Sequence, residues 1–269
     1  MAVQSISALS IAAMAVSALL SVAVPVILFF VVRKKYGKGI LPVILGGAGF
    51  LLFAMILEQL LHLVVLRPNP NGDIALMQSP FLFMLYGALA AGIFEETARF
   101  LSFHILKKRC EGFGTALKHG IGHGGTEAIL VGGISAVSSM VLVLMAQSGG
   151  AEGISMLGES VRQQVQTIAA TPSYMFLVSA AERMMALVLQ ISLSVIVFYS
   201  VYPKRRVWLF PLAVLLHALV DCPAALYQAG VIKNVWIVEG LVLVATIALA
   251  AIAVLIHKWQ KPEEQTMPA

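Results

Sequence analysis

The stretch SPFLFMLYGALAAGIFEETARFLSFHIL, residues 79–106, decides the fold class. It is long enough to cross the roughly 30 Å hydrocarbon core of a bilayer as a helix, which takes about 20 residues. It nevertheless carries Glu95, Glu96 and Arg99 in its second half. A charged group in the bilayer costs about 2.5–3.5 kcal/mol on insertion scales, so these side chains must face a bundle interior or a wet cavity. The stretch predicts a membrane helix with a polar face turned toward other helices.

The composition of the whole chain supports this interpretation. Hydrophobic residues make up 59% of the 269 residues and charged residues 12%, against about 45–50% and about 25% in soluble domains. These values exclude a soluble globular domain, a disordered chain and a coiled coil. Open strands would leave backbone groups unpaired in lipid, so every span should be a helix.

We predict an all-α, polytopic membrane protein with about seven helices around a polar cavity. It should form a single domain over residues 1–269, with its core at about 40–230 and a polar cytoplasmic tail at 261–269. The predicted spans are Leu9–Val32, Ile40–Leu66, Ser79–Leu106, Lys118–Ala146, Ser173–Tyr202, Val207–Tyr227 and Val235–Ile256.

Basic residues gather in alternate loops between these spans. Thirteen Lys and Arg residues fall on one side, Lys118 among them, and three on the other. The positive-inside rule then places the N-terminus outside and the C-terminus in the cytoplasm. The net charge of +5 reflects this topology and attraction to the anionic lipid bilayer, so no nucleic-acid partner is expected.

Seven of the thirteen acidic residues lie inside predicted spans, and their spacing is informative. Four pairs are four residues apart, which places both members on one helix face. Any single pair is also explained if its members satisfy one another locally and help to hold helices together. Several such pairs together favour a functional polar centre. The pairs are Glu58 with His62, Glu95 with Arg99, His123 with Glu127, and His217 with Asp221.

Distance along each helix from the nearest basic loop gives an expected depth. Glu95, Glu127 and His217 come out at about 18, 14 and 16 Å, and His123 is shallower at about 8 Å. Four other residues are expected nearer the outer side, in a second, structural network: Glu58, His62, Glu182 and Arg183.

The neighbouring carboxylates of Glu95 and Glu96 cannot easily both stay ionised in a low dielectric unless Arg99 or Arg183 neutralises one of them. We therefore interpret Glu95 as a candidate general base and Glu96 as its arginine-paired neighbour.

Four motifs in order carry a resemblance to a known family. They are GIFEETARF at 92–100, GHGGTEAI at 122–129, the ER pair at 182–183 and LLHALVD at 215–221. Together they resemble the YhfC group of bacterial intramembrane proteases, within the superfamily of CAAX proteases, bacteriocin-processing proteins and PrsW-like proteins. The resemblance covers roughly residues 40–230. It departs from the prenyl endopeptidases in having two residues instead of three between the second Glu and Arg99, and His119 in place of a Phe.

The resemblance implies an intramembrane endopeptidase of the bacterial cell membrane that acts on a membrane protein or peptide. In such an enzyme Glu95 activates water, His123 and His217 complete the site, and His217 with Asp221 holds the oxyanion. Glu96 and Arg99 match the rest of the acidic motif, and supporting roles fall to Glu127, Glu182 and Arg183.

Metal dependence and two alternative functions stay open at this point. Two histidines and a carboxylate suit catalytic zinc, and the ligands would then be Glu95, His123 and His217. Because no HExxH motif is present, a metal-free glutamate mechanism without a cofactor is the favoured interpretation. The alternatives to a protease are a catalytically silent immunity or assembly partner, and a proton-coupled transporter, although the sequence shows no inverted repeat.

Overall fold

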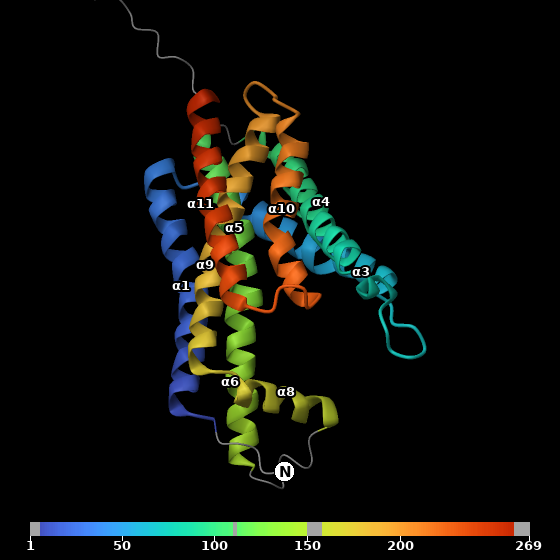
Figure 1. Ribbon diagram of the computed structural model, residues 1–269. Coiled ribbons are helices and arrows are strands. Elements are labelled where there is room, and N and C mark those ends of the chain that lie inside the picture. Colours follow the sequence, from blue (N-terminus) through green and yellow to red (C-terminus); the bar gives the residue numbers. More distant parts are fainter. Residues whose placement is uncertain (1–5, 110–111, 150–157, 261–269) are drawn as a thin grey trace, which may run out of the picture.

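The computed structural model describes residues 6–109, 112–149 and 158–260. Helices of α, π and 3₁₀ type account for all regular structure in this part of the chain (Figure 1). In order they are α1 (Ala8–Tyr36), α2 (Leu41–Gly49), the π-helix η1 (Phe50–Glu58), α3 (Gln59–Val65), the 3₁₀ turn η2 (Ala75–Gln78), α4 (Pro80–Leu106), α5 (Phe113–Glu127), the π-helix η3 (Ala128–Ile134), α6 (Ser135–Ser148), α8 (Glu159–Ala170), α9 (Ser173–Val201), α10 (Leu209–Gln228) and α11 (Val235–Gln260).

Seven spans are long and apolar enough to cross a membrane within the described ranges, which confirms the predicted all-α, multi-pass fold. Two of them are composite. Leu41–Val65 joins α2, η1 and α3, and Phe113–Ser148 joins α5, η3 and α6. In each, the π-helical segment adjoins a buried or half-buried acid, since η1 ends at Glu58 and η3 begins directly after Glu127. Local π-helical turns inside α-helices are frequent at functional sites.

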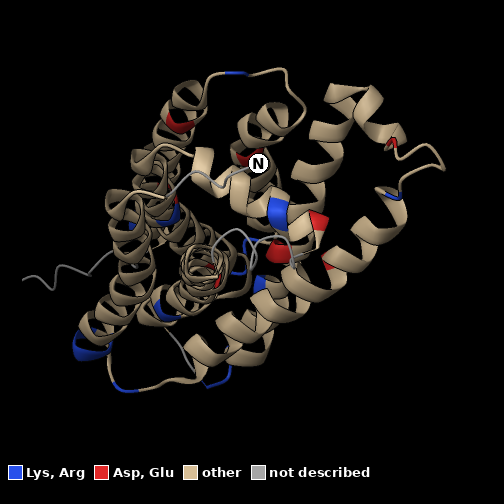
Figure 2. Ribbon diagram, turned by 90° about the horizontal axis from the view of Figure 1, so that it is seen from below, with Lys and Arg blue, Asp and Glu red and all other residues tan. Residues whose placement is uncertain are grey.

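The basic loops gather at one end of the bundle, where α1, α4, α9 and α11 finish (Figure 1). We call this the basic end, and the opposite end, where α1 begins, the neutral end. Figure 2, viewed from the neutral end, shows other charged positions enclosed by the helices. Lys118 is not a loop residue as expected. It lies inside α5 and is buried, and its Nζ donates to the carbonyls of Tyr36, Gly37 and Gly39 at 3.3, 3.0 and 3.3 Å.

The larger hydrophobic cluster lies in the basic half of the bundle, and a smaller one around Met14 and Val143 lies toward the neutral end. The larger cluster is built around α9, whose most apolar 18 residues are 72% buried, against 17–33% for the other spans. Phe103 and Leu106 of α4, Leu209 of α10 and Leu249 of α11 pack with the α9 residues 193–201 in one cluster. This cluster fills the interior of the basic half with apolar side chains.

Close backbone packing brings the motif-bearing helices together. A Cβ atom on Gly46 would lie 2.8 Å from His123 N, one on Gly124 would lie 2.7 Å from Cβ of Gln190, and one on Gly92 would lie 2.8 Å from the Val214 carbonyl oxygen. Real Cβ atoms essentially never approach so closely. Glycine therefore lets α2 and α9 lie against α5, and α10 against α4, as small residues do in membrane bundles.

A further helix, α8, lies in the connection between the spans Phe113–Ser148 and Ser173–Val201 (Figure 1). It lies at the neutral end and buries Val165 and Ile168. The predicted tail at 261–269 falls outside the described residues.

Candidate active site

One face of α4 carries the acidic motif. Arg99 Nη1 donates to Glu96 Oε1 at 2.5 Å, and Arg99 Nη2 approaches Glu95 Oε2 at 3.4 Å. Glu96 and Arg99 are completely buried, and 7% of Glu95 is exposed. Because Arg99 follows the two acids by three and four residues, one guanidinium group serves both carboxylates. A buried charge needs such a partner, and Glu96 is paired with arginine as expected.

His123 of α5 holds the Glu95 side chain from a second helix. Its Nε2 lies 2.9 Å from Glu95 Oε2, and the ring is fully buried and in edge contact with Phe50. The glycines on either side of His123 allow this position. Gly122 packs against Val43 of α2 and Gly124 against Gln190 of α9.

His217 and Asp221 of α10 complete the other wall. His217 Nδ1 lies 2.7 Å from Glu96 Oε1, and its Nε2 lies 3.5 Å from Asp221 Oδ2. Glu96 Oε1 thus contacts both the Arg99 guanidinium group and the His217 ring. These contacts hold the imidazole ring in place. The His217 side chain is 7% exposed and that of Asp221 37%, so the pair extends from the buried network toward open space.

Gln190 of α9 belongs to the same network, although the sequence analysis did not select it. Its Nε2 donates to Glu95 Oε2 at 3.0 Å and to Glu127 Oε2 at 2.6 Å, and its Oε1 accepts from Arg99 Nη2. One feature of the sequence points to Gln190. It is a polar residue inside an apolar span, seven residues after Arg183 and hence on the same helix face.

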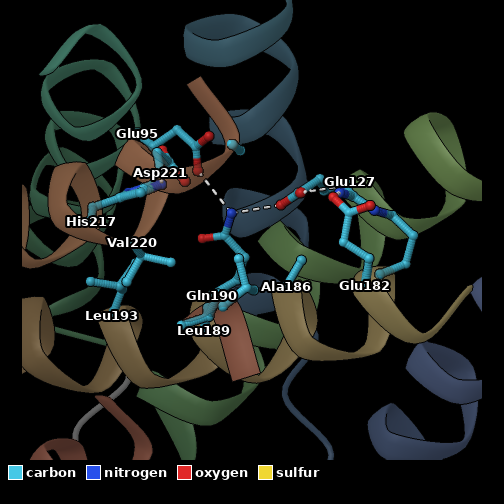
Figure 3. Close-up of a pocket in the computed structure, with 13 residues that line it drawn as sticks. Glu95, Glu127, Glu182, Ala186, Leu189, Gln190, Leu193, His217, Val220 and Asp221 are labelled. Atoms are coloured by element: carbon cyan, nitrogen blue, oxygen red, sulfur yellow. Dashed lines mark hydrogen bonds and ion pairs between the residues drawn. The ribbon is translucent and has the colours of Figure 1, made fainter. Parts of the chain in front are cut away.

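Glu127 lies between the Glu95 network and a second arginine. Arg183 Nη1 donates to Glu127 Oε1 at 2.9 Å and Arg183 Nη2 to Glu182 Oε1 at 2.6 Å. Through Gln190, this group is continuous with Glu95 (Figure 3). The expectation of a separate structural network containing Glu182 and Arg183 is therefore wrong. Glu58 and His62 do form their own pair, at 3.3 Å.

One further expectation needs correction, and the explanation by local pairing fails for one of the four pairs. His123 is not shallower than Glu95, because α5 begins at Phe113 and Lys118, the reference for the depth estimate, is itself buried. His123 and Glu127 also do not pair within the described residues. His123 turns to Glu95, whereas Glu127 turns to Arg183 and Gln190.

These side chains surround a cavity of about 230 Å³, which we call the site cavity (Figure 3). Its polar lining consists of Glu95, Glu127, Glu182, Arg183, Gln190, His217 and Asp221. The three donors to Glu95 all reach Oε2, and among the described residues Oε1 accepts no hydrogen bond. Glu95 therefore has one oxygen held by the protein and one available at the cavity wall. All predicted site residues lie at this cavity or directly behind it.

The sequence model of one family matches residues 20–242, and its description is YhfC intramembrane metalloprotease. The chain belongs to the YhfC family. It is also 36% identical over 243 residues to the uncharacterized membrane protein YhfC of Bacillus subtilis (strain 168), a match that covers 89% of this chain and 92% of the relative. No solved structure matches the chain. The wider relation to CAAX proteases and PrsW-like proteins stays a prediction.

The family description implies a metal ion, and the donor geometry tests this. The expected zinc ligands are Glu95, His123 and His217, a set suited to zinc by chemistry. In the structure His123 Nε2 is hydrogen-bonded to Glu95, and His217 Nδ1 to Glu96. Across the described ranges, no three His, Cys, Asp or Glu side chains are arranged so that they could hold a metal ion. The residues as placed do not fit a metal, and we derive no catalytic step through one.

Proposed function

We propose that this protein is an intramembrane endopeptidase that hydrolyses a peptide bond with water activated by Glu95. The observation that supports it best is the asymmetry of the Glu95 carboxylate. Three donors from α4, α5 and α9 hold Oε2, and Oε1 is available at the wall of a cavity inside the bundle. A positioned carboxylate next to space for water is the arrangement that a general base needs.

The reaction then proceeds in two steps. Glu95 Oε1 takes a proton from water, the water oxygen bonds to the scissile carbonyl carbon, and the carbonyl π electrons move onto its oxygen. The C–N bond breaks as the oxyanion collapses, and the proton held by Glu95 passes to the leaving amine. The products are a carboxylic acid and an amine, so atoms and charge balance without a co-reactant.

His217 is suited to stabilise the oxyanion. Glu96 holds its Nδ1 at 2.7 Å, so Nε2 faces the cavity on the side of Asp221. An imidazole N–H fixed in this way is a preorganised donor for negative charge that develops in the transition state. Asp221 lies beside this nitrogen at 3.5 Å, and His123 with Gln190 keeps the base in its orientation.

The test is a cleavage assay in proteoliposomes. The purified protein is reconstituted with a panel of single-span membrane peptides, and mass spectrometry detects the products. Glu95→Gln should lower the rate by about 10²–10⁴-fold, because the amide keeps the shape of the side chain but is not a base. The matched control is Glu159→Gln at the start of α8, where, in the described part of the chain, Glu159 contacts the side chains of Arg162 and Gln163, and it should cleave like the wild type.

Two outcomes would contradict the proposal. Wild-type rates in Glu95→Gln, together with complete inhibition by a chelator, would replace the glutamate mechanism with a metal centre. If no peptide is cleaved, and Glu95→Gln still supports a cellular phenotype that requires the intact protein, the protein is a membrane partner and not an enzyme.

A further inference from the structure

We infer that the substrate reaches Glu95 from the neutral end of the bundle, through a second cavity that receives an extended peptide segment. This inference rests on the proposed function. The second cavity, here the entry cavity, has a volume of about 430 Å³, within the range of ligand-binding pockets. The residues that line it include His62, Leu66, Tyr86, Gly87, Asp221 and Gln228.

The entry cavity adjoins the site cavity. Glu182, Arg183 and Asp221 line both. Asp221 is the neighbour of His217, so the junction of the two cavities lies beside the proposed oxyanion donor. A peptide segment that extends from the entry cavity past this junction would bring its backbone into the site cavity, which Glu95 and His217 line.

The entry cavity leads toward the neutral end. Leu66 follows the last residue of α3, and Gln228 is the exposed last residue of α10, which runs from the basic end toward the neutral end (Figure 1). Gly87 lies eight residues before Glu95 on α4, hence about 12 Å nearer the neutral end. In the basic half, the apolar cluster around Phe103, Leu106 and Leu209 lies between the site cavity and the basic loops. The entry cavity therefore offers the path to the base from the neutral side.

The wall of the entry cavity suits a peptide backbone. His62 Nδ1 and the Tyr86 hydroxyl lie 2.7 Å apart, and Gln228 adds an amide, between the apolar surfaces of Phe83 and Ala225. A peptide that leaves its helical form within a membrane needs partners for its backbone groups. His62 and Tyr86 already contact each other, and His62 also contacts Glu58, so a peptide would have to share or replace these hydrogen bonds, whereas lipid offers none.

Thiol accessibility tests the direction of entry without any need for activity. Cys110 and Cys222 are replaced by serine, and Gly87→Cys is introduced, because nothing lies within 4 Å of a Cβ atom at this position. Oriented vesicles are treated with a charged, membrane-impermeant methanethiosulfonate. Labelling is expected from the neutral face only, at least tenfold faster than for Gly240→Cys. Gly240 is equally open but lines neither cavity.

The same variant tests whether the path is used. Modification of Gly87→Cys should lower cleavage at least tenfold, and reduction of the mixed disulfide should restore it, while Gly240→Cys remains active throughout. Labelling from the basic face, or full cleavage by modified Gly87→Cys, would overturn the inference and leave the proposed function intact. If the unmodified protein cleaves nothing, the proposed function fails, whereas labelling from the neutral face would still identify the entry cavity as the aqueous access to Glu95.

Discussion

Gly92→Ala should disturb the contact between α4 and α10 that aligns the two halves of the candidate site. An added Cβ atom would lie 2.8 Å from the Val214 carbonyl oxygen, whereas ordinary contact begins at 3.4 Å. The two helices must therefore separate by about 0.6 Å. Glu96 lies one turn after Gly92, and His217 lies three residues after Val214, so the same separation acts on their side chains.

The magnitude follows from this displacement. The distance between Glu96 Oε1 and His217 Nδ1 would grow from 2.7 Å to about 3.3 Å, beyond the usual range for a hydrogen bond. Overpacking of this kind costs about 1–3 kcal/mol, which corresponds to a fall of several degrees in the unfolding midpoint. A misplacement of 1 Å can cost about 10²-fold in rate, so 0.6 Å should cost roughly tenfold.

Thermal unfolding in detergent and peptide cleavage in proteoliposomes measure the two effects. Gly240→Ala is the control, because this helical glycine has no neighbour within 4 Å of an added Cβ atom, and alanine should leave its stability unchanged or slightly higher. A Gly92→Ala protein that melts and cleaves like the control would refute the close α4–α10 contact and the alignment argued from it.

Three further predictions follow from contacts described above. Gln190→Leu removes the amide shared by two carboxylates, and since a hydrogen bond to a charged group contributes about 1.5–3 kcal/mol, kcat should fall by about 10–100-fold in the cleavage assay. Lys118→Met leaves three backbone carbonyls without their donor and should lower the unfolding midpoint by several degrees, whereas Lys108→Met in the basic loop should not. Reporter fusions after Arg206 should indicate the cytoplasm and fusions within 147–172 the opposite side; the reverse pattern would invert the entry direction relative to the cell.

The sequence was sufficient for the fold class and for most of the polar residues, because charge inside an apolar span is a strong signal. It was weaker on which side chains meet. Spacing along one helix shows that His123 and Glu127 share a face, but it does not show which neighbouring helix each will contact. The packing of α9 against Gly124 decides that Glu127 pairs with Arg183 and Gln190.

Two errors have simple physical causes. The depth expected for His123 places Lys118 at the membrane surface, but the ammonium group of Lys118 is buried against the end of α1. Gln190 gives no signal of charge, because its side chain does not titrate. An uncharged amide both donates and accepts, which suits it to a position among Glu95, Glu127 and Arg99.

The arrangement of α4 also bears on how the protein enters the membrane. Of the seven spans α4 is the least apolar, and its three charged groups would cost about 8–10 kcal/mol if each were inserted alone. His123, Gln190 and His217 belong to segments that are synthesised later. Arg99, in contrast, reaches Glu95 and Glu96 within the same helix, so this pairing is available as soon as α4 forms. Arg99 therefore offers Glu95 and Glu96 a partner before the later helices of the site have been made.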